Sequence, residues 1–593
     1  MASLAQMLKP ARQQSLSWAL LPAAACALIA TFIQSLIGLD CDVSWLITVN
    51  EKILAGQRLY VEIIEPNPPA SVWLYTPEVW LAQRLSLRPE AVVAAVFLAG
   101  ALLACAAVAK ISARLASPPH PEVLVTATAF VTMILPVGTF AQREHAALLL
   151  ALPVLTGLAV LAEGLALPRS WRIMLGIAAG LVVIIKPHFA LAILPAAAFA
   201  WARSRALSPL VMPAIAAALT VALYSAALFI FTPAYLDLVP MLTAVYLPLR
   251  EHMLTVLAGP VIVVPVTIAA LVWMLRPGRL PALPAMLLIG SAGFACAGLV
   301  QMKGYLNHAL PGIALGFVAL VVAATLPMVD RIRATAVLAT AGILLALQLY
   351  AMASIRPPAG LKEAVERVAP AHPTMVTLGP DLLTGHPVVR NVEGDWVGSR
   401  PALFIAAGAQ RALATAPPAH AARLRAWYRA DLEAFAADLS GERPDVVLVD
   451  ARPGVAWLRQ EPVIRAAMSA YRPAARANDV EVWIAASNEV LWGPSLSAQK
   501  KTAAPFGTAV RKIRTVPNLQ LVRDVREGRA QLGADALHRA NGRNGDESGD
   551  EAVLDGGCTL LVLDQLQKLA HGLRSLVPTY EATTPRPACP LAG

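Results

Sequence analysis

Long apolar runs dominate the chain as far as residue 353, and short polar turns separate them. Runs of spanning length lie at 17–38, 91–109, 121–139, 146–162, 208–231, 256–275, 283–300, 305–327 and 333–353. A helix needs roughly 20 apolar residues to cross a bilayer, so each run predicts one transmembrane helix. This pattern stops after residue 353.

The apolar stretch over 173–202 is longer than one span, and Lys186-Pro187-His188 interrupts it. Short turns rich in basic residues mark the cytoplasmic ends of transmembrane helices. The paired basic residues are Lys110/Arg114, Arg169/Arg172, Arg203/Arg205, Arg276/Arg279 and Arg331/Arg333. All five pairs lie on one side only if 173–202 crosses twice. The sequence therefore predicts about eleven transmembrane helices, a cytoplasmic N-terminus and a C-terminal part outside.

The turn at Lys186 is expected to lie unusually deep in the membrane for an outer turn. If two helices divide 173–202 between them, each is roughly 22 Å long, whereas the hydrocarbon core is roughly 30 Å thick. We therefore expect Lys186 to lie below the outer membrane surface. A cation buried at that depth needs an anion beside it.

The part that follows residue 353 alternates strand-like and helical segments. Apolar, β-branched runs over 374–378, 446–450 and 480–485 predict strands, and 401–413 and 419–439 predict helices. We therefore divide the chain into a transmembrane domain over 1–353, an exterior α/β domain over 354–490 and a tail over 491–593. The polar, Gly- and Asp-rich composition of the tail predicts disorder.

Composition supports a multi-pass membrane protein and excludes a soluble one. The chain is 57% hydrophobic and 15% charged, and its mean hydropathy is +0.61. The net charge of +10 does not indicate nucleic-acid binding, because much of the basic excess sits in short turns between apolar runs. The six cysteines have neither the spacing of metal ligands nor that of a disulfide framework.

The first outer loop, over 39–90, holds the most informative residues. Asp40 and Asp42 stand where the first apolar run ends, and an acid at that depth is costly unless it is paired or functional. Helical sequence follows over 43–55, and Asp is a good N-cap. One acid is expected to cap this helix while the other faces a cavity at the membrane surface as a general base. The alternative is that both acids only cap or solubilise the loop.

Each later outer turn combines a basic residue with a histidine. The pairs are Arg143 with His145, Lys186 with His188, Arg250 with His252, and Lys303 with His308. Cations at this level suit a phosphate or pyrophosphate near the headgroups, although ordinary interfacial charge is the alternative. The histidines suit hydrogen bonding to a substrate. Their spacing matches no metal motif, so we predict no metal site and no cofactor, with a divalent metal as the less favoured option.

The first outer loop and a late turn resemble a known family. The acid after the first span, the segment LAGQRLYVEIIEPNPPASVWLY and the turn QMKGYLNHALP resemble GT-C glycosyltransferases, above all the bacterial relatives of protein O-mannosyltransferase and lipid A aminoarabinose transferase. The likeness covers roughly residues 17–353. It implies an inner-membrane enzyme that transfers a sugar, with inversion, from a polyprenyl-phosphate donor to an unidentified glycan, lipid or protein acceptor at the periplasmic face.

The resemblance also implies roles for residues. It places a catalytic aspartate at Asp42, with Asp40 second, although several members have an Asp-Glu pair where this chain has Asp42 followed by Val43. The expected donor-phosphate ligands are Lys186, Arg143, Lys303 and Arg58. The expected substrate-binding residues are Tyr60, Glu65, His145, His308, Arg250 and His252.

Two other functions fit a multi-pass membrane protein. A transporter or flippase predicts charges near mid-membrane and repeated, broken helices, but the charges here cluster in the outer turns and no internal repeat is present. A non-catalytic polysaccharide-assembly protein, with the exterior domain as its binding module, is separated from an enzyme only by an activity test.

Overall fold

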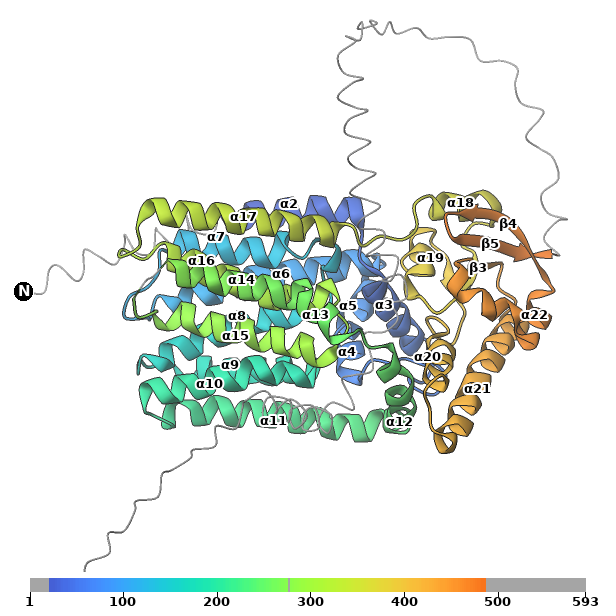
Figure 1. Cartoon of the computed structure of the whole chain (residues 1–593), viewed down its shortest axis with the longest axis horizontal. Helices are drawn as coiled ribbons and strands as arrows, with labels where there is room; N and C mark the ends of the chain where they lie inside the picture. Colours follow the sequence, from blue (N-terminus) through green and yellow to red (C-terminus); the bar gives the residue numbers. More distant parts are fainter. Residues whose placement is uncertain (1–20, 276–277, 487–593) are drawn as a thin grey trace, which may run out of the picture.

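The structure is a computed structural model that describes residues 21–275 and 278–486. It joins a bundle of long helices to a smaller α/β unit, which lies at one end of the bundle (Figure 1). The predicted tail over 491–593 and Arg276 lie outside the described residues.

Helices run side by side along the bundle and coincide with the predicted apolar runs (Figure 1). They are α2 (Leu21–Ile37), α6 (Pro89–Ser112), α7 (Pro121–Ala129), α8 (Arg143–Ala162), α9 (Arg169–Ile185), α10 (Ala190–Ser204), α11 (Ser208–Phe231), α14 (Pro260–Met274), α15 (Ala282–Gln301), α16 (Leu306–Ala324) and α17 (Arg331–Ala353).

Six of the described helices are long and apolar enough to cross a membrane, namely α6, α8, α11, α15, α16 and α17. The number rises to seven if α2 and α3 (Cys41–Leu54), which are bent by 80° at their junction, count as one broken span. The other apolar helices of the bundle are shorter, so the predicted count of eleven spans stays a prediction.

The structure confirms the predicted break in the stretch over 173–202. Helix α9 ends at Ile185 and α10 begins at Ala190, and a short 3-10 turn, Pro187–Phe189, joins them. Pro187 has no N–H to continue the helix, which explains why α9 ends before it. Lys186 is fully buried at this break.

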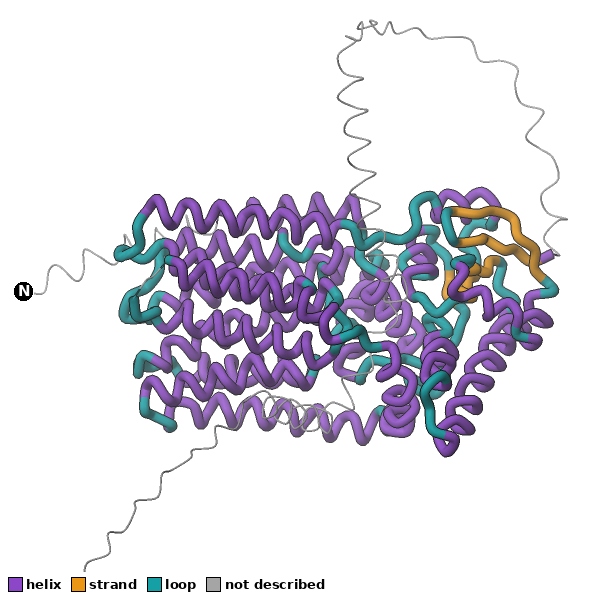
Figure 2. The backbone as a smooth tube through the Cα atoms, in the orientation of Figure 1, coloured by secondary structure: helices purple, strands orange, loops and turns teal. Residues whose placement is uncertain are grey.

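The turns of the bundle gather at its two opposite ends (Figure 2). At one end, the amide of Ala116 donates to Glu163 Oε2 at 2.8 Å, which joins the turns after α6 and α8. At the other end, the amide of Glu251 donates to the carbonyl of Met302 at 2.7 Å. The turns predicted as inner and outer are therefore sorted to different ends.

Shorter elements build the end of the bundle that faces the α/β unit. Helix α3, α4 (Pro69–Trp73) and α5 (Thr76–Leu85) belong to the first outer loop, and α12 (Ala234–Tyr246) and α13 (Met253–Ala258) follow α11. The helix predicted over 43–55 is α3, and Asp40 is its N-cap.

The α/β unit holds a five-stranded sheet with the order β2-β1-β3-β5-β4. Its strands are β1 (Thr374–Leu378), β2 (Asp395–Trp396), β3 (Val446–Asp450), β4 (Tyr471–Ala477) and β5 (Val480–Ala485), and its helices are α18 (Leu361–Val368), α19 (Val388–Asn391), α20 (Phe404–Leu413), α21 (Pro418–Glu442) and α22 (Pro462–Met468). Strand β1 pairs in parallel with β2 and β3, whereas β5 is antiparallel to both β3 and β4. The three predicted strands are confirmed.

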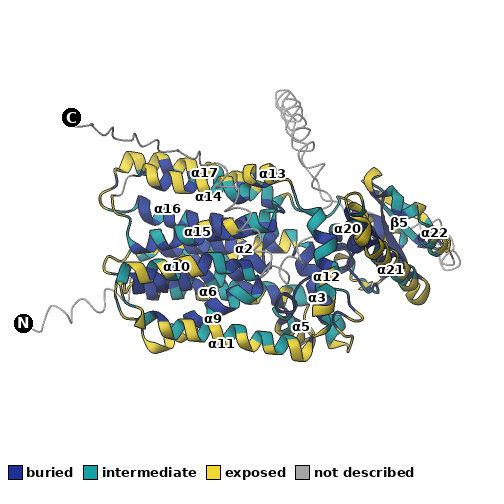
Figure 3. Cartoon of the chain, turned by 60° about the horizontal axis from the view of Figure 1, so that its bottom comes forward, coloured by how far each residue is buried: buried dark blue, intermediate teal, exposed yellow. Residues whose placement is uncertain are grey.

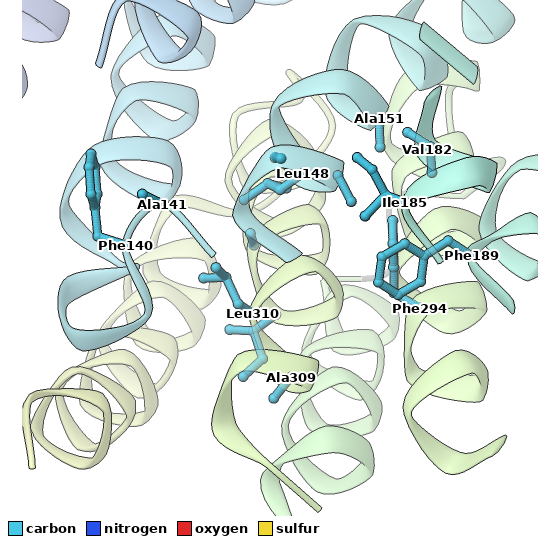
Figure 4. Close-up of a cluster of buried hydrophobic side chains, with 14 of the residues drawn as sticks. Phe140, Ala141, Leu148, Ala151, Val182, Ile185, Phe189, Phe294, Ala309 and Leu310 are labelled. Atoms are coloured by element: carbon cyan, nitrogen blue, oxygen red, sulfur yellow. The ribbon is translucent and has the colours of Figure 1, made fainter. Parts of the chain in front are cut away.

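Burial distinguishes central helices from peripheral ones (Figure 3). Most residues of α8 and α16 are buried, whereas Leu210 is the one buried residue of the 24 in α11. The core below the outer turns is apolar, with Leu148 and Ala151 of α8 facing Val182 and Ile185 of α9 (Figure 4). A polar site at this end therefore rests on a close-packed apolar floor.

Helices α9 and α11 approach each other through glycine. A Cβ on Gly176 would lie 2.3 Å from the carbonyl oxygen of Pro213, and one on Gly180 would lie 2.7 Å from Cβ of Thr220. Small residues four apart let helix backbones pack closely in membranes. This contact holds α11 against α9, the helix that ends just before Lys186.

Replacing Gly176 by alanine is expected to push α9 and α11 apart, because the backbone of Pro213 cannot rotate out of the way. We expect a loss of about 1–3 kcal/mol in unfolding free energy, typical of an overpacked contact, seen as a lower thermal midpoint in detergent. Gly342→Ala in α17 is the control, since a Cβ there has nothing within 4 Å. Equal midpoints for the two variants would contradict this packing role.

Candidate functional site

The two aspartates of the first outer loop have different environments. Asp40 caps α3 by accepting from the amide of Val43 at 3.0 Å, and its other carboxylate oxygen contacts the side-chain amide of Gln142. Asp42 lies in the first turn of α3, and its Oδ2 is 3.9 Å from Nη2 of Arg143. Asp40 is therefore the cap, and Asp42 is the acid that faces a cation.

A fully buried ion pair lies next to this contact. Nζ of Lys186, at the break between α9 and α10, is 2.8 Å from Oε1 of Glu144 in the first turn of α8. Nε2 of His308, near the start of α16, lies 3.7 Å from the same oxygen. Glu144 is thus the anion expected beside buried Lys186. Three separate segments of the chain meet at its carboxylate.

The polar contacts continue into the late turn after α15. Lys186 Nζ donates to Oε1 of Gln301 at 3.3 Å. Two residues on, Nζ of buried Lys303 donates to the carbonyl of Leu249 at 3.3 Å and lies 5.5 Å from the centre of the Tyr246 ring. We call the following residues the charged cluster: Asp42, Arg143, Glu144, Lys186, Gln301, Lys303 and His308.

The charged cluster combines buried cations with buried carboxylates at one end of an apolar bundle. Because Arg143 and Lys186 are completely buried, their charges are stabilised by neighbouring carboxylates rather than by water. An anionic ligand that replaced a carboxylate contact would meet cations already held in place. The arrangement suits binding a phosphate beside a carboxylate that takes up a proton.

Several residues predicted for the site make contacts outside the charged cluster. Arg58 is exposed and pairs with Glu62 at 3.4 Å within its own turn. His252 is exposed and accepts from the amide of Leu254 at 3.3 Å as the cap of α13. Arg250 is half-buried and donates to the carbonyl of Val300 at 3.4 Å. Each of these side chains is engaged by its own turn or a nearby backbone group, and its predicted role stays a prediction.

Glu65 and Tyr60 shape the first outer loop from inside. Buried Glu65 accepts from the amide and the side-chain amide of Asn67, at 2.7 and 2.6 Å, and from the indole of Trp45. Burial raises the pKa of Glu65. The Tyr60 hydroxyl donates to the carbonyl of Asn67 at 2.6 Å. Both side chains are engaged in holding one turn, so this geometry does not support direct substrate contact.

His145 is engaged in the same structural way. Its Nδ1 accepts from the amide of Ala141 at 3.0 Å, and its Nε2 lies 2.7 Å from the carbonyl of Thr132. With both ring nitrogens bonded to backbone groups, His145 fixes the turn before α8. Among the predicted histidines, His308 lies beside Glu144.

Sequence reasoning missed Glu144 and Gln301 as site residues. The signal for Glu144 was present, because it is an acid at the start of an apolar run, next to Arg143, and Lys186 required an anion. Gln301 had a weaker signal, since it begins the late turn that holds Lys303.

Among the described residues, one group of side chains could hold a metal ion. Ligand atoms of Asp40, Cys41 and Asp42 lie within 4.8 Å of one another. Asp40 already caps α3 and contacts Gln142, so only part of its coordination capacity is open to a cation. We assign no chemical step to a metal here.

No protein-family model and no curated protein matches this chain. Among solved structures, it is similar to ArnT from Cupriavidus metallidurans bound to undecaprenyl phosphate, with a TM-score of 0.47 and 12% identity over 79% of this chain and 98% of that one. It is also similar to the oligosaccharyltransferase AglB from Archaeoglobus fulgidus, with a TM-score of 0.39 and 13% identity over 81% and 75% of the two chains. For the arabinofuranosyltransferase AftD from Mycobacteria, the TM-score is 0.40, with 15% identity over 79% and 40%.

Two of these neighbours are named as an oligosaccharyltransferase and an arabinofuranosyltransferase, and the third was solved with undecaprenyl phosphate. All three TM-scores lie below 0.5, and the identities are low.

The Lys186–Glu144 pair is expected to show strong energetic coupling. Glu144→Gln or Lys186→Met alone leaves one buried charge without its closest partner and should cost about 3–5 kcal/mol of unfolding free energy. The double variant removes both charges, so it should lose much less than the sum of the two single losses. Thermal or denaturant unfolding in detergent measures this cycle.

The control for this cycle is the exposed pair of Lys362 and Glu366, 3.6 Å apart, whose coupling should be about 0–1 kcal/mol. Additive losses at Lys186 and Glu144 would show that the two groups do not stabilise each other.

Proposed function

We propose that this protein is a membrane glycosyltransferase that moves a sugar from a polyprenyl-phosphate donor to a cell-envelope acceptor. The observation that carries the proposal is the charged cluster, in which buried Lys186 and Arg143 lie beside carboxylates at one end of an apolar bundle. We assign this end to the periplasmic face of the inner membrane, because the turns at the other end carry the paired basic residues.

Asp42 is proposed as the general base. It takes the proton of the acceptor hydroxyl or amine as the acceptor atom forms a bond to the anomeric carbon of the sugar. Asp40 is the less favoured base, because one of its oxygens caps α3 and the other contacts Gln142. Attack from the side opposite the phosphate inverts the configuration at the anomeric carbon.

The cations of the cluster are proposed to bind the departing phosphate. When the bond between the anomeric carbon and the phosphate oxygen breaks, its electron pair stays on that oxygen. Lys186, Arg143 and Lys303 supply positive charge where this negative charge grows. His308 lies where it can donate a further hydrogen bond to the phosphate. Glu144 holds Lys186 in place before the donor arrives.

The location of the cluster supports a lipid-linked donor. A polyprenyl tail dissolves in the bilayer beside the apolar helices, and its phosphate then lies at the headgroup level, where the ends of these helices are expected. A solute transporter is less well supported, because the cluster sits at one end of the bundle rather than at mid-membrane. If no sugar transfer is found, the alternative function of a non-catalytic assembly protein is favoured.

The base assignment is tested with radiolabelled polyprenyl-phosphate sugars and the purified protein in liposomes supplied with envelope extract as acceptor. Asp42→Asn should lower transfer by roughly 10²–10⁴-fold, the usual contribution of a general base. Asp40→Asn should have a smaller effect, because Asn also caps helices well.

The control variant is Asp237→Asn, which changes an exposed acid in the first turn of α12 and should leave transfer unchanged. If neither Asp40→Asn nor Asp42→Asn reduces transfer by a correctly inserted protein, the proposed mechanism is wrong.

A further inference from the structure

Arg390 of the α/β unit forms a polar contact with two segments of the bundle end. Its guanidinium reaches both oxygens of Glu51 on α3, at 2.6 and 3.0 Å. Its Nε lies 2.5 Å from Oε1 of Glu90, in the first turn of α6. A fourth hydrogen bond, at 3.3 Å, runs from Nη1 to the hydroxyl of Thr48. One side chain thus joins the α/β unit to both α3 and α6.

The geometry of this contact is that of a strong ion pair. Two parallel N–H···O bonds between a guanidinium and one carboxylate give more energy and more orientation than a single bond. The Arg390 side chain is 12% exposed, so solvent screens its charge only in part. A lysine could not reproduce the two-oxygen contact with Glu51 while also reaching Glu90.

A second contact between the α/β unit and α3 lies at Ser44, one helical turn before Thr48. Nδ1 of His386 is 3.3 Å from the hydroxyl of Ser44, and its ring centre lies 5.4 Å from that of Trp45 and 4.7 Å from that of Trp396. Ser44, Thr48 and Glu51 are four and three residues apart, so they share one face of α3. The α/β unit therefore covers α3 along most of its length.

The same helix presents both candidate bases. Asp40 caps α3, and Asp42 lies in its first turn. Because an α-helix is rigid over three turns, holding its middle and its end against the α/β unit also holds its first turn. The distance of 3.9 Å between Asp42 and Arg143 thus depends on where α3 is held.

We infer that Arg390 is a positioning residue for the proposed transfer, and that the α/β unit completes the active site by fixing α3. The unit is not a separate binding module in this account. The consequence for turnover rests on the proposed function, whereas the consequence for α3 does not. A displaced α3 misplaces the base, and misplacement by about 1 Å can cost 10²-fold in rate.

The test uses the full chain in lipid nanodiscs and two measurements. Hydrogen–deuterium exchange over residues 41–54 should be faster in Arg390→Gln than in the wild type. Turnover at saturating donor should fall by about 10²-fold, whereas the affinity for undecaprenyl phosphate should change by less than about twofold because the cations of the cluster are untouched. Arg390→Lys should give exchange and turnover between those of the wild type and those of Arg390→Gln, since it keeps a charge but loses the two-oxygen contact.

A matched control separates this role from a general effect of losing an arginine. Arg459 pairs with Glu481 at 3.2 Å entirely within the α/β unit. Arg459→Gln should change neither the exchange of α3 nor the turnover. If Arg390→Gln does not fold, Arg390→Lys carries the test with the same measurements.

Two results would overturn the inference. One is unchanged exchange over 41–54 in Arg390→Gln. The other is faster exchange with full turnover, which would show that the position of α3 is irrelevant to the reaction. If the wild type transfers no sugar, the proposed function fails, and the exchange measurement alone still decides whether Arg390 holds α3.

Discussion

The buried ion pair between Lys186 and Glu144 is the interaction on which the site depends. Placing two charges in a low-dielectric interior costs several kcal/mol for each, and their attraction offsets this only at short range with further hydrogen bonds. The fold meets these requirements by ending α9 just before Lys186 and starting α8 beside it, with Gln301 and His308 at the same place. Three separate turns are thereby brought to one point, and Asp42 reaches this point through Arg143.

Much of the fold could be predicted because it follows local rules. Apolar runs of spanning length located the helices of the bundle, and Lys186-Pro187 located the break between α9 and α10, since proline cannot continue a helix. Three strands were found from β-branched, buried runs. Electrostatics also predicted that Lys186 has an anion beside it, although nothing local showed that Glu144 supplies it.

The remaining features depend on contacts between distant segments. The pair of Arg390 and Glu51 joins residues 339 apart, and no pattern in either segment signals it. The family resemblance placed Arg58 among the phosphate ligands, and nothing local showed that its own turn supplies Glu62 as a partner. Strand β4 was missed because Pro473 and several polar residues hide its strand pattern. It can still form a strand because it lies at an edge of the sheet, where proline is tolerated.

The central claim is that the charged cluster recognises the phosphate of a polyprenyl lipid. Native mass spectrometry of the purified protein with undecaprenyl phosphate and with undecaprenol, the same lipid without its phosphate, tests this claim most directly. We expect the phosphate form to stay bound under conditions that remove the alcohol, because the phosphate is the group proposed to contact Lys186 and Arg143. Equal retention of the two lipids, or retention of neither, would contradict it.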